Sequence, residues 1–286
     1  MLYYNLKRII KIKSLKVINM KWNNRYFTNS VLLLTLLFAF CSCEEASELP
    51  NRDWQLVWQD EFDTDGVIDA TKWTFDLGAG GWGNNELQTY TSNADNVIIK
   101  DGILKITANS NPFSSARVKT QGIFEQTYGR FEAKIKMPWG PGIWPAFWLL
   151  GSDIETVGWP QCGEIDIMEY RGQQPNLVHG TVHGPGYSGG AGITKSYGFE
   201  NNRFDVDFHV FAIEWGKDYI DYYVDNALYQ RITPNDVTGE WVYDHPFYII
   251  LNVAVGGDYV GFPTSQTLFP QIMEVDWIRV YEEVDQ

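Results

Sequence analysis

From about position 54 onward, the chain consists largely of short stretches in which apolar residues recur at every second position. Residues 131–137 alternate between apolar and charged side chains, as a half-buried β-strand does. Residues 97–107 and 219–232 each contain two such stretches around an Asp-Gly or Asp-Asn dipeptide, which is typical of tight hairpins. The longer apolar run 247–255 indicates a central strand. Many short strands without a convincing helix favour an all-β sandwich or barrel.

The N-terminal segment has a different pattern and reads as a targeting signal. Residues 31–40 are ten apolar positions behind a basic region, whereas a membrane-spanning helix needs roughly 20. The run ends at Ser42-Cys43, which resembles the cleavage site of bacterial lipoproteins. Met20 is an alternative start of the chain. We therefore expect residues 1–43 to be a signal peptide, residues 44–52 a short tether and residues 53–286 one folded domain.

This interpretation predicts an exported protein that a lipid on Cys43 anchors to a membrane. The expected location is the outer membrane or cell surface of a bacterium. A plain secretory signal, with a periplasmic or secreted protein, is the alternative. Beyond Cys43 the only cysteine is Cys162, so the folded domain can form no internal disulfide.

Charge narrows the range of partners. The net charge is -14, and seven of the 22 basic residues lie within the first 43 positions, where there is no acidic residue. The remainder therefore sets 15 basic residues against 36 acidic ones. Such a body argues against nucleic-acid binding, which depends on Lys and Arg beside phosphate. It suits a neutral polymer, and we expect a monomer.

One strand-like stretch, G-E-I-D-I-M-E-Y-R, collects three carboxylates. On a regular strand Glu164 and Asp166 share a face, while Glu169 points to the other. One extra residue would reverse this, so we predict a β-bulge at Ile167–Met168 that returns Glu169 to the common face.

Paired carboxylates of this kind can cleave glycosidic bonds, because one attacks the anomeric carbon while a protonated second one donates to the leaving oxygen. Like charges nearby help to keep the acid protonated. The spacing alone also fits the solvated acidic face of an edge strand. Flanking segments decide between the two: G-I-W-P-A-F-W-L-L at 142–150, W-P-Q-C at 159–162 and G-T-V-H-G at 180–184.

Together these segments resemble glycoside hydrolase family 16, and most closely its laminarinase-like endo-β-1,3-glucanases, from about residue 54 to residue 281. The resemblance implies a β-jelly-roll sandwich of two curved antiparallel sheets with a concave substrate cleft. It also implies endo-acting hydrolysis of β-1,3-glucosidic bonds in laminarin-type glucans with retention of configuration. Glu164 would be the nucleophile and Glu169 the acid/base, and Asp166 would hydrogen-bond the nucleophile.

Three alternatives stay open at this point. A mixed-linkage β-1,3-1,4-glucanase is the first, although dedicated lichenases carry a shorter E-x-D-x-E. Agarases and carrageenases share the longer spacing, but sulfated galactans usually call for basic pocket residues. A non-catalytic glucan-binding protein on the same fold would be expected to lack Glu164 or Glu169.

Tryptophans beside glycine or proline are candidates for the substrate cleft, because flat aromatic faces complement the apolar faces of sugar rings. Binding pockets combine such aromatic walls with a few polar groups at fixed positions. The family resemblance indicates which polar residues these are here. The expected substrate-binding residues are Asn85, Arg117, Trp144, Trp148, Trp159 and His183.

No cofactor is expected for catalysis. His179 and His183 lie on one face of a predicted strand but about 13 Å apart, too far to share an ion. The resemblance implies a structural Ca²⁺ remote from catalysis, held by Glu61, the carbonyl of Gly102, and Asp276. Oxygen ligands suit that ion.

Overall fold

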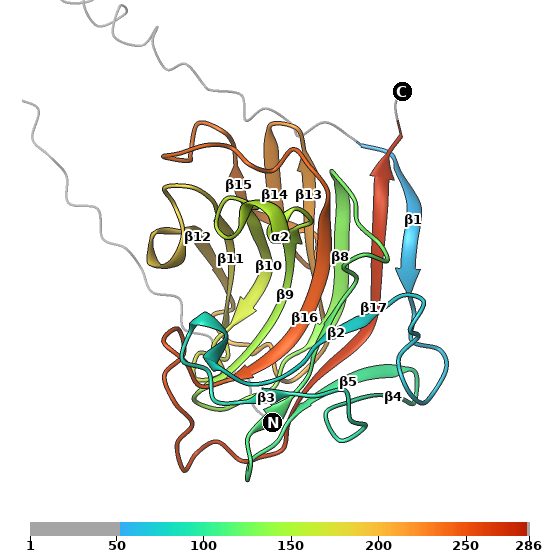
Figure 1. Ribbon diagram of the computed structural model, residues 1–286, viewed down its shortest axis with the longest axis vertical. Coiled ribbons are helices and arrows are strands. Elements are labelled where there is room, and N and C mark those ends of the chain that lie inside the picture. Colours follow the sequence, from blue (N-terminus) through green and yellow to red (C-terminus); the bar gives the residue numbers. More distant parts are fainter. Residues whose placement is uncertain (1–51, 285–286) are drawn as a thin grey trace, which may run out of the picture. The chain divides into compact units, whose positions relative to one another are not determined.

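The computed structural model describes residues 52–284, and these fold into two large antiparallel sheets (Figure 1). Within this part of the chain the only α-helix is α2 (Ile154–Val157), accompanied by the short 3-10 turns η1 (Gly81–Gly83) and η2 (Gly189–Ala191). The all-β class and the lack of a long helix are therefore confirmed. No helix among the described residues is long and apolar enough to cross a membrane.

The first sheet has eight strands. Its order is β15-β14-β13-β8-β17-β5-β4, and β1 pairs with β17 beside this path. In chain order, its strands are β1 (Trp54–Asp60), β4 (Val97–Lys100), β5 (Ile103–Ala108), β8 (Gly129–Lys136), β13 (His209–Gly216), β14 (Tyr219–Val224), β15 (Ala227–Ile232) and β17 (Gln271–Glu283).

The second sheet has seven strands, in the order β12-β11-β10-β9-β16-β7-β2. In chain order, they are β2 (Thr74–Asp76), β7 (Arg117–Lys119), β9 (Ile143–Gly151), β10 (Glu164–Tyr170), β11 (Leu177–His183), β12 (Ile193–Gly198) and β16 (Phe247–Val255). Two further short strands, β3 (Thr89–Tyr90) and β6 (Ser114–Ser115), pair in parallel.

The core lies between the two sheets. Alternate residues of β8 and β17 from one sheet, and of β9, β10 and β16 from the other, belong to a single buried apolar cluster. The central strands β9, β10 and β16 curve strongly along their length (Figure 1). As predicted, β16 is central and every one of its residues is buried. Burying this much apolar surface is the main favourable contribution to folding.

Both predicted hairpins are present, and their turns have the expected backbone. Asp101 and Gly102 join β4 to β5 with φ of 57° and 72°, and Asp225 and Asn226 join β14 to β15 with φ of 48° and 67°. Positive φ at both central residues is the mark of a type I′ turn, whose twist matches that of the strands.

The described residues begin at Arg52, the last residue of the predicted tether. Its guanidinium donates to Glu214 at 2.7 Å, and only 6% of its side chain is exposed. The predicted signal peptide, the predicted lipid anchor on Cys43 and almost all of the predicted tether lie outside the described residues. Cys162, which lies within them, is a free, buried thiol.

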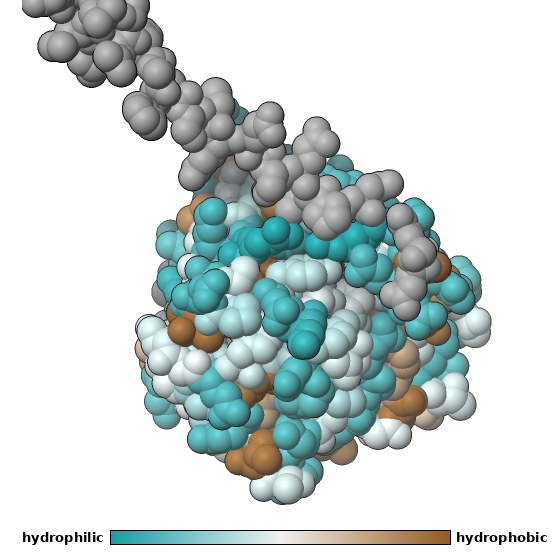
Figure 2. All heavy atoms as spheres, turned by 90° about the horizontal axis from the view of Figure 1, so that it is seen from above, coloured by the Kyte–Doolittle hydropathy of each residue, from teal (hydrophilic) through white to brown (hydrophobic). Residues whose placement is uncertain are grey.

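The surface is mostly polar. Figure 2 shows one face on which hydrophilic residues dominate and apolar ones occur in small separate areas. Scattered exposed apolar side chains of this kind are normal on the surface of a folded domain.

Candidate active site

The three carboxylates lie on β10, in the middle of the seven-stranded sheet. The register of β10 slips between Asp166 and Glu169 against β11, and between Asp166 and Met168 against β9. This is the predicted bulge. It places two successive side chains, Ile167 and Met168, in the core. Glu169 therefore joins Glu164 and Asp166 on the opposite side of the sheet. We call that side of the seven-stranded sheet the site face.

Side chains from neighbouring segments bind the two glutamates. Nε1 of Trp159 donates to Oε2 of Glu164 at 3.0 Å, and Nε1 of Trp144 donates to Oε1 of Glu169 at 3.1 Å. Thr181 donates to the other oxygen of Glu169 at 3.4 Å. A different tryptophan thus holds each glutamate. Both indoles make hydrogen bonds to the carboxylates, in addition to any stacking on a sugar.

His183 closes the group from β11, where it lies directly opposite Glu164. Its Nε2 is 3.7 Å from Oε1 of Glu164 and 3.3 Å from Oδ2 of Asp166. The same histidine is close to Trp159, with 6.1 Å between ring centroids. Three of the predicted substrate-binding residues, Trp144, Trp159 and His183, therefore contact the carboxylates or one another.

A second part of the site face lies on the other side of β9. Arg117 on β7 has its guanidinium 5.1 Å from the ring centre of Trp82 and 4.7 Å from that of Trp148. Asp76 pairs with Arg117 at 3.0 Å, and Trp148 donates to Asn252 at 2.8 Å. These contacts form a wall of alternating aromatic and cationic planes, and both Arg117 and Trp148 were predicted here.

Asn85 lies at the edge of this wall, in the loop that follows η1. Its amide donates to both carboxylate oxygens of Asp258, at 3.1 and 3.0 Å. In the same loop as Asp258, the ring of Tyr259 packs against Trp144 with centroids 4.9 Å apart. The loop after β16 thus touches both parts of the site.

Sequence reasoning missed several of these neighbours. Thr181 lies inside the G-T-V-H-G segment, but a threonine on a strand carries no signal of its own. Asn252 is the single polar residue in the apolar run of β16, which could have marked it. Asp258 and Tyr259 belong to a loop whose position only the fold reveals.

Comparison with known proteins agrees with this geometry. The model of glycosyl hydrolases family 16 matches residues 84–279. A beta-glucanase of Rhodothermus marinus is 42% identical over 248 residues, which cover 81% of this chain and 86% of that protein. The catalytic domain of an endo-1,3-beta-glucanase (laminarinase) from Thermotoga petrophila RKU-1 is 47% identical with a TM-score of 0.79, covering 82% of this chain and 100% of that chain. The endo-beta-1,3-glucanase of Pyrococcus furiosus is 46% identical with a TM-score of 0.80, covering 84% and 98%.

The chain belongs to glycosyl hydrolase family 16. Its jelly-roll fold, inferred from the alternation of residues and from the resemblance, is thereby confirmed.

Electrostatics of the family 16 site follow from burial and crowding. Removal from water raises the pKa of Glu164, Asp166 and Glu169 to about 8 each. Repulsion from Asp166 contributes to the raised pKa of both glutamates, while His183 opposes it. Because these groups share one site, their protons leave in coupled steps. The raised pKa values let the group keep a protonated carboxyl near neutral pH, which the general acid of a glycosidase must be.

The predicted calcium ligands lie in or beside the eight-stranded sheet, not on the sheet that carries the three carboxylates. The strand register brings Glu61, which follows β1, and Gly102, in the β4–β5 turn, towards the bulge of β17 that contains Asp276. However, Glu61 accepts two hydrogen bonds from Arg279, at 2.7 and 2.9 Å, and Asp276 pairs with Lys134 at 2.6 Å. Basic side chains thus already neutralise both carboxylates. In this arrangement their oxygens are not free to coordinate Ca²⁺.

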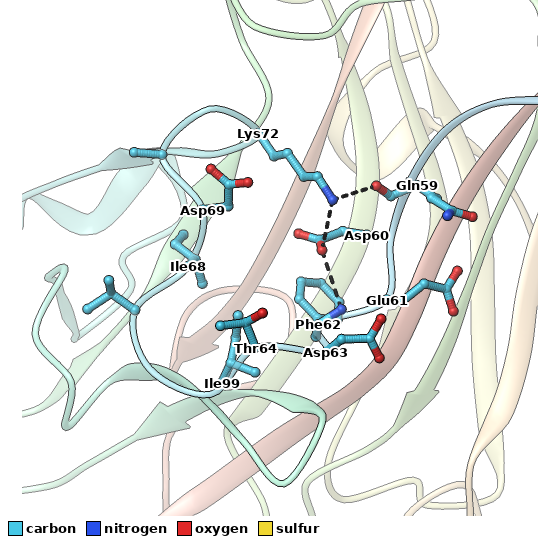
Figure 3. Close-up of a pocket in the computed structure, with 12 residues that line it drawn as sticks. Gln59, Asp60, Glu61, Phe62, Asp63, Thr64, Ile68, Asp69, Lys72 and Ile99 are labelled. Atoms are coloured by element: carbon cyan, nitrogen blue, oxygen red, sulfur yellow. Dashed lines mark hydrogen bonds and ion pairs between the residues drawn. The ribbon is translucent and has the colours of Figure 1, made fainter.

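A hollow of about 620 Å³ adjoins this region, well away from β10 (Figure 3). Lys72 spans it and contacts Asp60 at 3.2 Å and the carbonyl of Gln59 at 2.9 Å. Asp60 also accepts from the indole of Trp73 at 2.8 Å. Because Lys72 and Asp60 are paired with each other, we assign this hollow a structural role and place the chemistry on the site face.

The raised pKa values predict that the active site costs stability as the pH rises. A carboxyl whose pKa is higher in the folded state stabilises the fold fully below its ordinary value of 4.5, and this stabilisation is lost as the pH rises through about 8. Glu164→Gln cannot ionise. Its melting temperature should equal that of the wild type near pH 4 and exceed it above pH 8. The difference should be about 2–4 °C for each kcal/mol by which the free energy of unfolding of the variant exceeds that of the wild type.

Thermal unfolding at a series of pH values measures this difference. Glu155→Gln, which removes an exposed carboxyl from α2, is the matched control and should show no pH-dependent gain. A difference between Glu164→Gln and wild type that is the same at every pH would contradict the electrostatic explanation.

Proposed function

We propose that the protein is an endo-acting β-1,3-glucanase that hydrolyses laminarin-type glucans by a retaining double displacement. The observation that carries the proposal is the bulge in β10, which gathers Glu164, Asp166 and Glu169 on one face. The similarity to a beta-glucanase and to laminarinase catalytic domains supports the same substrate class. Presence of both glutamates argues against a protein that only binds glucan.

In this mechanism, Glu164 attacks the anomeric carbon and forms the glycosyl-enzyme, while Glu169 gives its proton to the leaving oxygen. Glu169 then takes a proton from water, and that water releases the sugar with its original configuration. The indole of Trp159 fixes one oxygen of Glu164, which leaves the other for attack. Asp166 and His183 act oppositely on the nucleophile: Asp166 raises the pKa of Glu164 by repulsion, and His183 lowers it.

The glucan is expected to cross the site face from the wall of Trp82, Arg117 and Trp148 towards β11. The aromatic planes can stack on sugar rings, and the guanidinium of Arg117 can donate to hydroxyl groups. Mixed-linkage β-1,3-1,4-glucan is the alternative substrate, because stacking and hydroxyl contacts of this kind suit either linkage. Product analysis on laminarin, lichenan and agarose discriminates among the three substrates; agarose as the preferred one would overturn the proposal.

Truncating the two glutamates should separate their roles. Both Glu164→Ala and Glu169→Ala should lose hydrolysis of polymer by roughly 10²-fold or more, since each removes a group used in the first step. With an activated aryl β-glycoside and azide, Glu169→Ala still forms the glycosyl-enzyme and should give the β-glycosyl azide. Glu164→Ala lacks the nucleophile and should give the α-glycosyl azide.

Proton NMR of the products reads this stereochemistry directly. The wild type without azide is the control and should release a sugar of retained configuration. Exchange of the two outcomes would reverse the roles of the glutamates, and full activity of either variant on polymer would move the site elsewhere.

The rate of hydrolysis should follow a bell-shaped pH profile with both limbs above the usual range for glutamate. Activity should rise when the first proton leaves, because Glu164 must be ionised, and fall when Glu169 loses its own. Burial raises the pKa of both groups, so both limbs move upward in pH. Initial rates on laminarin at constant ionic strength test this, with Glu155→Gln as control; a rate that stays flat into alkaline solution would exclude a carboxylic general acid.

We also propose that the mature enzyme is exported and tethered by lipid on Cys43, and acts as a monomer. The support is the sequence around Ser42-Cys43. Cys43→Ala should move the protein from the membrane fraction to the soluble fraction, and Cys162→Ala is the matched control. Failure of the wild type to incorporate labelled fatty acid would refute the anchor.

A structural calcium ion near Glu61, Gly102 and Asp276 is a separate proposal, supported only by the family resemblance. If it binds, calcium added to chelator-treated protein should raise the melting temperature by mass action and leave kcat unchanged. Calorimetric titration with no heat of binding would remove calcium from the description of this protein.

A further inference from the structure

The group at the nucleophile end of the site face has the composition of a transition-metal site. Glu164, Asp166 and His183 each offer one ligand atom, and these three atoms all lie within 4.8 Å of one another. They come from two neighbouring strands, β10 and β11, so a rigid sheet sets their separation. This is a different set from the pair His179 and His183, whose separation along one strand excludes a shared ion.

Two members of this group have a buried polar atom without a hydrogen-bond partner, Oδ2 of Asp166 and Nδ1 of His183. Asp166 is only 4% exposed, and its buried Oδ2 accepts no hydrogen bond, although it lies 3.3 Å from Nε2 of His183. A buried carboxylate oxygen without a donor costs free energy, and a cation could remove that cost.

His183 is held so that Nε2 faces the carboxylates. The opposite edge of its ring, with Nδ1 and Cε1, packs so closely on Gly192 that an added Cβ there would lie 2.4 Å from Cε1. This contact limits how far the ring can turn, and a ligand restricted in this way needs less ordering when an ion arrives.

The two distances to His183 are close to those around a tetrahedral ion, and the two carboxylate oxygens lie within 4.8 Å of each other. With ligand bonds of about 2.0–2.1 Å, two ligand atoms of tetrahedral Zn²⁺ are separated by about 3.3 Å. Nε2 of His183 lies 3.3 Å from Asp166 Oδ2 and 3.7 Å from Glu164 Oε1. Small side-chain shifts would therefore complete three corners, and water could take the fourth. The imidazole favours Zn²⁺ or Cu²⁺ over Ca²⁺, which takes oxygen ligands.

We propose that Glu164, Asp166 and His183 form a binding site for a divalent transition-metal ion of the Zn²⁺ type, and that this ion is a reversible inhibitor that competes with glucan. The inhibition, though not the binding, rests on the proposed function. Glu164 cannot attack a sugar while its oxygen holds the metal, and the ion occupies space that the sugar beside the scissile bond would need.

Calorimetric titration of the untagged protein with ZnCl₂, in buffer without chelator, tests the binding. We expect one Zn²⁺ per chain, at least tenfold weaker binding to His183→Asn, and unchanged binding to His179→Asn, a buried histidine on the same strand. Asp166→Asn is the second variant should His183→Asn fold poorly, and circular dichroism checks both. Ca²⁺ should not displace the zinc, whereas a laminari-oligosaccharide should weaken its binding.

Three results would overturn the site: no stoichiometric binding, equal binding to His183→Asn and wild type, or binding that the oligosaccharide does not affect. In a parallel rate assay on laminarin, Zn²⁺ should raise KM and leave kcat unchanged, and EDTA should restore KM. Because calorimetry needs no turnover, a protein inactive on glucans would refute the proposed function while the metal site is still tested.

Discussion

Repulsion among three buried carboxylates is the constraint around which this structure is arranged. A regular strand would send Glu169 into the core, and the bulge at Ile167–Met168 turns it back towards Glu164 and Asp166. Burying like charges together costs free energy unless neighbours compensate. The neighbours here supply indole and hydroxyl donors and an imidazole. They reduce the repulsion without a fixed cationic partner, so the group can still exchange the proton that the chemistry needs.

The apolar core between the two sheets offsets the free-energy cost of burying the three carboxylates together. The inner faces of β9, β10 and β16 are apolar throughout and join one core with the other sheet. On the site face, Leu150, Tyr248 and Ile250 form a smaller apolar cluster with Cys162, the residue that precedes the catalytic strand by two positions. The carboxylates thus have the apolar core behind them and this smaller apolar cluster beside them. This explains why water is removed from them although one side of the sheet faces outward.

Local rules predicted most of the fold, and they failed where contacts are distant in sequence. Alternation and turn dipeptides located the hairpins, and the spacing of Glu164, Asp166 and Glu169 located the bulge, because each is decided within a few residues. The resemblance implied that Asn85 is a partner for a sugar hydroxyl, but no local pattern predicted that its amide donates to Asp258, which lies 173 positions later. Glu61 likewise binds Arg279 across 218 positions. Such partners depend on the packing of loops, which no short pattern records.

The wall of the site that is remote from the glutamates is fixed by a chain of hydrogen bonds. Trp148 donates to Asn252, whose amide donates to the hydroxyl of Tyr90, which in turn reaches Glu86 at 3.4 Å. Every link after the tryptophan is buried or half-buried, so each group depends on the next for its partner. Burial raises the pKa of Glu86, and its oxygens also accept from Asn84 and Gln88. The orientation of Trp148 on the site face thus depends on a carboxylate in the loop before β3, which ties the shape of that face to a segment outside its seven strands.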